Sequence, residues 1–149
     1  MTSRQRRLLK ETLLILAATV MAVVGMIHLK DHVNRTEAMR AMTELGRRVL
    51  DYRHRQGVLP PESFVRDIED TLEGSERLGH LTYRAARLSP HAPDWMILAY
   101  SLKRHPASFL RDGYVVLRLN GRVEWMPTVS FEALLSEQGK PEELASFKK

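Results

Sequence analysis

Residues 12–29 read TLLILAATVMAVVGMIHL, an apolar run that no acidic residue, lysine or arginine interrupts. As a helix with a 1.5 Å rise per residue, this run is about 27 Å long, close to the roughly 30 Å hydrocarbon core of a bilayer. A cleaved signal peptide would have a shorter apolar core and a small-residue cleavage site, whereas residues 26–30 read MIHLK. A buried core helix is the other alternative. The length favours one membrane-spanning helix that stays uncut.

The charges that flank this run indicate its orientation. Residues 1–11 form a basic segment in which only Glu11 is acidic, and its basic side chains are Arg4, Arg6, Arg7 and Lys10. After the run, Lys30 is balanced by Asp31. Basic flanks stay on the cytoplasmic side of a membrane. We therefore expect a single-pass protein of the inner membrane, with a cytoplasmic N-terminus and a periplasmic C-terminal domain.

Composition limits what the exported part does. Of the formal net charge of +5 on the 149 residues, residues 1–30 carry +4 and the remainder only +1. A nucleic-acid-binding domain would carry a basic stripe on its folded part, so nucleic acid is not expected as a partner. The chain has no cysteine, and its exported domain therefore depends on a hydrophobic core without disulfides.

The apolar run continues without a break into residues 30–56, an amphipathic segment. Apolar side chains recur there at alternating spacings of four and three residues, which places them on one helix face: Ala38, Met42, Leu45, Val49 and Tyr52. We expect this face to pack the helix against a sheet. No proline or strong turn signal precedes Gly57, so one continuous helix is predicted. Two helices with a break near residues 30–34 are the alternative.

The sequence of residues 57–138 predicts a small α+β domain. A short helix is expected at residues 64–72, strands at 81–88, 95–102, 114–119 and 122–126, and a terminal helix at 131–138 with Ser130 as its N-cap. Asn120-Gly121 favours a type I′ hairpin turn, and Trp95 and Trp125 are expected in the sheet core or as cross-strand partners. Residues 139–149 form a polar tail. The predicted fold is a long N-terminal helix packed on an antiparallel sheet of about four strands, with a short C-terminal helix.

Two segments resemble known pilin-like proteins. Residues 50–60, LDYRHRQGVLP, resemble the tyrosine, glycine and proline element that ends the long helix of type II secretion pseudopilins and type IV pilins. The second segment resembles the C-terminal signature of pilin-like proteins abundant in planctomycetes; it comprises residues 97–100, His105 and residues 115–126. The signature residues here are His105, Asn120, Gly121, Glu124 and Trp125. The resemblance implies a structural or accessory subunit whose partners are the lipid bilayer and other pilin-like or secretion-system membrane proteins, or a second copy of this chain.

The N-terminal junction differs from that of a prepilin. Prepilins have a glycine before a phenylalanine and a glutamate inside the mature helix. Here residues 7–13 read RLLKETL, with no glycine, and Glu11 precedes the apolar segment. The sequence therefore predicts a helix that a prepilin peptidase leaves uncut.

Small residues and histidines are the remaining candidates for function. Ala18, Ala22 and Gly25 share a helix face and would let a second membrane helix approach closely. His28 and His32 also share a face, but no third ligand accompanies them, so no metal or other cofactor is expected. His105 is expected to pin its loop to the hairpin by a hydrogen bond.

Neither Ser101 nor Ser108 has the context of a catalytic nucleophile, and no enzymatic activity is expected. The alternative function is a membrane-anchored periplasmic binding or sensor module. It would require a pocket at the loop of residues 103–113.

Overall fold

The computed structural model describes residues 3–89, 91–105 and 111–138; the tail at 139–149 and residues 106–110 of the expected loop lie outside this set. The described elements follow one another along the chain as α1 (Ser3–Gln56), α2 (Glu62–Glu69), η1 (Ser75–Arg77), β1 (Leu81–Tyr83), η2 (Ala85–Arg87), β2 (Ile97–Lys103), β3 (Gly113–Arg118), β4 (Val123–Pro127) and α3 (Thr128–Gln138). This arrangement confirms the predicted α+β fold.

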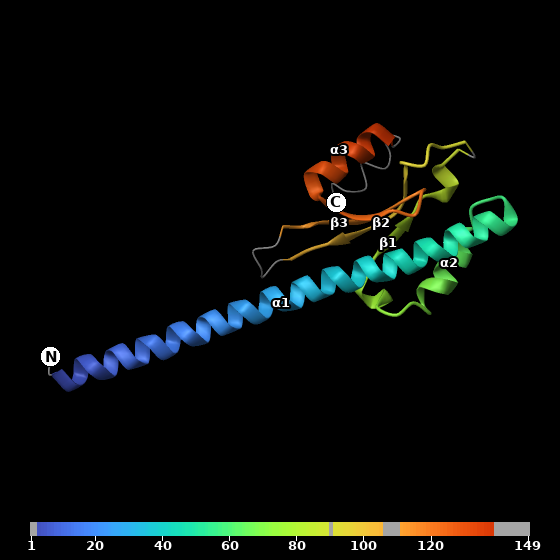
Figure 1. Ribbon diagram of the computed structural model, residues 1–149. Coiled ribbons are helices and arrows are strands. Elements are labelled where there is room, and N and C mark those ends of the chain that lie inside the picture. Colours follow the sequence, from blue (N-terminus) through green and yellow to red (C-terminus); the bar gives the residue numbers. More distant parts are fainter. Residues whose placement is uncertain (1–2, 90, 106–110, 139–149) are drawn as a thin grey trace.

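α1 is one helix of 54 residues, about 80 Å long at 1.5 Å per residue, and it does not break near residues 30–34. Its N-terminal half projects away from the rest of the molecule, and its C-terminal half lies along the domain (Figure 1). The helix ends at Gln56. Gly57 follows with a φ of +74°, which turns the chain out of the helix while its N–H still bonds to the Arg53 carbonyl at 2.8 Å. Pro60 and Pro61 follow and prevent further helix.

The sheet lies between α1 and α3. Among the described residues its strands are ordered β1-β2-β3-β4, each antiparallel to its neighbour. On one face, Ala99, Val115 and Leu117 are buried together with α1. On the other face, Val116 and Tyr114 pack under α3. Alternate residues of a strand point to opposite faces, so each central strand contributes to both apolar clusters.

The first two strands differ from the prediction. β1 ends at Tyr83, and the chain turns into η2 at Arg84. Arg84 is only 2% exposed, and its guanidinium donates to the Ile97 carbonyl at 3.0 Å. β2 begins at Ile97, so the prediction for Trp95 is wrong. A turn closed by the Met96 N–H and the Pro93 carbonyl at 3.0 Å leaves Trp95 outside the sheet and 51% exposed.

The expected type I′ turn is also wrong. Gly121 has a φ of +85°, whereas no non-glycine residue that the structure describes has a positive φ, Asn120 included. The Gly121 N–H donates to the Arg118 carbonyl, and the Arg118 N–H donates to the Arg122 carbonyl, both at 2.9 Å. This is the three-residue loop in which a left-handed glycine follows a type I turn.

Both short helices begin earlier than expected. α2 spans Glu62–Glu69 and ends before residue 72, because the Thr71 N–H bonds to the Ile68 carbonyl at 3.0 Å and tightens the last turn. α3 begins directly after β4, at Thr128. Ser130 therefore lies inside α3, and the prediction that it is the N-cap is wrong.

Candidate functional site

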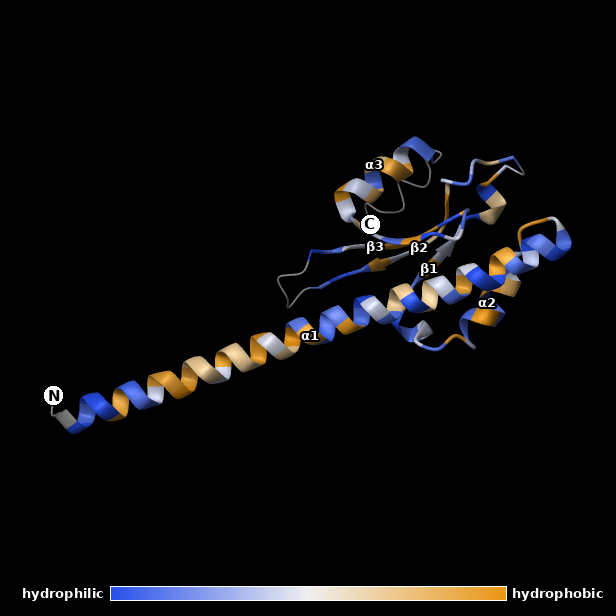
Figure 2. Ribbon diagram, viewed as in Figure 1, coloured by the Kyte–Doolittle hydropathy of each residue, from blue (hydrophilic) through white to orange (hydrophobic). Residues whose placement is uncertain are grey.

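The first candidate site is the bare half of α1. Among the described residues, α1 is the one helix that is long and apolar enough to cross a membrane. None of the residues in its most apolar 18-residue stretch is buried. Figure 2 shows the hydrophobic colour concentrated on this projecting half. Ala18, Ala22 and Gly25 are all exposed there, and a Cβ added to Gly25 would meet nothing within 4 Å. This face is free to contact another helix.

The second site is the face of α1 that packs under the sheet. Ala38, Met42, Leu45 and Val49 are each 0% exposed. Tyr52, at the far end of the stripe, is half-buried, and its ring centroid lies 4.7 Å from that of Phe64 on α2. All five residues of the stripe thus lie on the packed side of the helix.

The predicted stripe does not include Gly46, which is also buried on this face of α1. A Cβ at Gly46 would lie 2.7 Å from Leu117 Cδ1, so the missing side chain leaves room for the Leu117 side chain of β3 against α1. Its position between Leu45 and Val49, on the apolar face, was the available signal.

On the exposed side of the same turn, hydrogen bonds from Arg47 and Arg48 lower the pKa of Glu44 to about 2.

The third site surrounds His105, where β2 ends beside α1. The His105 side chain is 4% exposed, and its Nδ1 lies 3.6 Å from Asp31 Oδ2 on α1. Its main-chain N–H donates to Asp112 Oδ1 at 2.7 Å, which joins the two ends of the β2–β3 connection. Within the described chain neither ring nitrogen has a hydrogen-bond partner, so the ring makes no hydrogen bond there that would pin the loop to the hairpin. The ring instead faces Trp125 of β4, with centroids 5.8 Å apart.

Trp125 links this site to α1. The Arg35 guanidinium carbon lies 4.3 Å from the Trp125 ring centroid, a cation–π contact, and burial lowers the pKa of Arg35. Gly113 lies beneath the same ring. A Cβ there would be 2.6 Å from Trp125 Cζ2 and 2.4 Å from the Met126 carbonyl oxygen. Glycine is therefore required at the start of β3.

The remaining signature residues lie at the opposite end of the sheet from His105. Asn120 and Gly121 form the β3–β4 turn, and the Asn120 side chain accepts from the Arg122 N–H at 3.0 Å. Glu124 accepts a hydrogen bond from Arg118, which also donates to the Trp95 carbonyl at 2.6 Å. The five signature residues therefore do not form one site. His105 and Trp125 are in contact, whereas the turn residues Asn120 and Gly121 are not part of that site.

Two of the cavities lined by described residues bear on ligand binding, and both are of a size that holds small molecules. One, of about 350 Å³, lies where α1 ends and is lined by Gly57, Pro60, Tyr83 and Leu119 among others. The other, of about 650 Å³, lies on the α3 side of the sheet, and its lining includes His80, Arg104, Asp112, Thr128 and Glu132. Among the described residues no group of three or more histidine, aspartate or glutamate side chains is arranged to hold a metal ion, and His28 and His32 gain no third ligand there.

Comparison with family models, with curated proteins and with solved structures finds no match for this chain.

Proposed function

We propose that this chain is a single-pass, membrane-anchored, pilin- or pseudopilin-like subunit with a structural or accessory role in a type II secretion or related surface-assembly system. The observation that carries the proposal is α1 itself. Its N-terminal half is bare and apolar, whereas its C-terminal half is buried under an antiparallel sheet of the same chain. One rigid element thus joins the membrane to the folded domain.

The expected orientation follows from charge. The basic side chains of residues 4–10 precede the apolar run, and the positive-inside rule keeps them in the cytoplasm. The sheet and α3 then lie in the periplasm, on the outer side of the inner membrane. This is the side on which a surface-assembly subunit meets its partners.

The mechanism we propose is association between membrane helices. Without a hydrophobic driving force inside a bilayer, helices associate where small side chains let their backbones approach. Ala18, Ala22 and Gly25 supply such a face, and it is unoccupied by the rest of the described chain. The partner would be the membrane helix of another pilin-like or secretion-system protein, or a second copy of this chain.

Leucines on this face should weaken the association. We expect the double substitution Ala22→Leu and Gly25→Leu to reduce the signal of a bacterial membrane two-hybrid assay several-fold, because two bulky side chains separate the helices. The matched control is Val20→Leu with Val24→Leu, which lies on the opposite side of a helix with 3.6 residues per turn. Equal signals from the two double variants would contradict association through this face.

The larger cavity favours a second candidate, a membrane-anchored binding or sensor module. Its volume of about 650 Å³ is typical of ligand sites, and Arg104 and Asp112 come from the two ends of the β2–β3 connection. Crosslinking in native membranes, followed by identification of the neighbours, distinguishes the two candidates. Pilin-like or secretion-system neighbours support the assembly subunit, whereas a chain without protein neighbours supports the binding module.

A further inference from the structure

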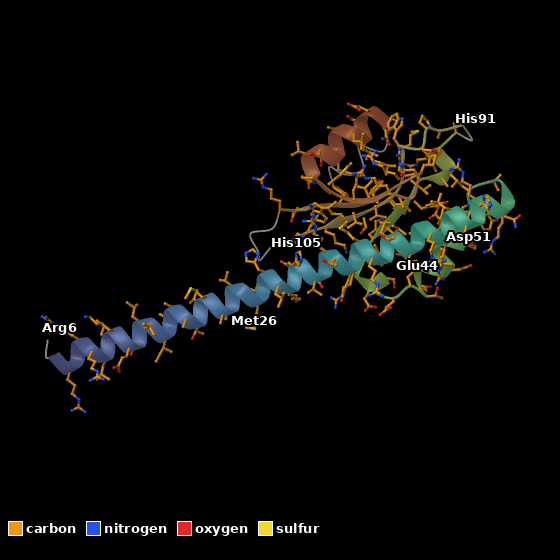
Figure 3. The ribbon with its side chains drawn as sticks, viewed as in Figure 1. Arg6, Met26, Glu44, Asp51, His91 and His105 are labelled. Atoms are coloured by element: carbon orange, nitrogen blue, oxygen red, sulfur yellow. The ribbon has the colours of Figure 1, made fainter. Side chains whose placement is uncertain are left out.

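The membrane-facing end of the domain lies close to the expected bilayer surface. Asp31, which approaches His105 to 3.6 Å, is only two residues beyond Leu29, the last residue of the apolar run. Two residues correspond to about 3 Å along a helix axis. Figure 3 shows His105 beside α1, between the labelled positions Met26 and Glu44. The end of β2 therefore comes down to the point where α1 leaves the membrane.

The thickness of a bilayer places this contact among the lipid headgroups. The polar layer on each side of the hydrocarbon core is about 5–8 Å thick. His105 lies at that level: its Nδ1 is 3.6 Å from Asp31 Oδ2 on α1, and the Asp112 carboxylate accepts its main-chain N–H. The residue that precedes His105 and the residue that precedes Asp112 are then within side-chain reach of the same layer.

Both of these preceding residues are basic. Arg104 precedes His105 and Arg111 precedes Asp112; both are exposed, as is Lys30 on α1. None of the three makes an ion pair or hydrogen bond with the part of the chain that the structure describes. The nearby Asp31 is only 18% exposed, beside His105, so its charge is turned into the protein.

From this geometry we propose that Lys30, Arg104 and Arg111 bind anionic lipid headgroups and so fix the domain against the bilayer surface. The proposal rests on the proposed membrane anchor. Basic side chains at a membrane surface are attracted by anionic lipids, and their long apolar stems let the charge reach the headgroups. Residues 31–149 carry a net charge of only +1, so the attraction comes from this end and not from the domain as a whole.

The two tryptophans offer a test on the full chain. Trp125 contacts His105 near the membrane, whereas Trp95 lies beyond the other end of β2. With Trp95→Phe as background, Trp125 emission is measured in nanodiscs that contain a headgroup nitroxide lipid, with and without phosphatidylglycerol. We expect quenching about two-fold stronger with phosphatidylglycerol, reduced by high salt. The double variant Arg104→Gln and Arg111→Gln should lose this difference.

Arg47→Gln with Arg122→Gln is the matched control. It removes two exposed arginines away from the membrane-facing end and should keep the lipid dependence. Equal quenching in both lipid mixtures, or an unchanged lipid dependence after Arg104 and Arg111 are replaced, overturns the headgroup proposal. Failure of the anchor itself is distinguishable, because the chain would then not enter the nanodiscs at all.

Discussion

Replacing Leu45 with alanine should lower the free energy of unfolding of the domain by about 2–5 kcal/mol, as for other fully buried leucines. The Leu45 side chain is 0% exposed in the cluster that α1 forms with the sheet. Its truncation removes apolar contacts and leaves a cavity that two rigid elements cannot close. Denaturant unfolding of the full chain in detergent micelles, followed by near-UV circular dichroism, measures the loss.

Leu14→Ala is the control for this substitution because it makes the same change on the same helix. Leu14 is 72% exposed, so the unfolding free energy of the domain should stay within about 0.5 kcal/mol of the original. If Leu45→Ala and Leu14→Ala had the same effect, α1 would not be part of the domain core.

A methyl group at Gly113 should destabilise the domain by about 1–3 kcal/mol, the usual cost of overpacking a close-packed site. The added Cβ would lie 2.4 Å from the Met126 carbonyl oxygen, which is backbone and cannot move aside without shifting β4. Because Trp125 also lies within 2.6 Å, we expect Gly113→Ala to displace its ring from His105 and Arg35. A change in Trp125 emission, measured with Trp95→Phe as background, should accompany the lower stability.

Gly25→Ala is the matched control, since nothing lies within 4 Å of its added Cβ. Alanine is also the better helix former at such a position. Gly25→Ala should therefore leave domain stability and Trp125 emission unchanged. Unchanged stability in Gly113→Ala as well would show that β3 and β4 are further apart than this structure places them.

The strongest sequence patterns predicted the architecture because they reflect local physics. The stripe that includes Met42 and Leu45 has helical spacing, and the absence of proline before Gly57 makes one continuous helix. The four-strand antiparallel sheet and the terminal helix followed from apolar runs separated by turn residues. Periodicity of this kind depends on nothing beyond the neighbouring residues.

The errors lie where distant residues decide the structure. Arg84 ends β1 because its guanidinium reaches the Ile97 carbonyl, 13 residues away. Asn120 keeps a negative φ in a hairpin turn that also bonds to the segment before β2, through the Leu119 N–H and the Met96 carbonyl. The same limit applies to the site: nothing in the spacing of Asp31 and His105 indicates that they meet.

We expect α1 to cross the membrane with its basic end in the cytoplasm and the sheet on the outer side. The chain has no cysteine, so Ser3→Cys and Ser136→Cys each introduce a single thiol, one at the start of α1 and one exposed on α3. Bacterial spheroplasts are treated with a membrane-impermeant maleimide before and after lysis. We expect the Ser136→Cys variant to be labelled in intact spheroplasts and the Ser3→Cys variant to be labelled only after lysis. Labelling of the Ser3 variant in intact spheroplasts, or of the Ser136 variant only after lysis, would rule out this orientation.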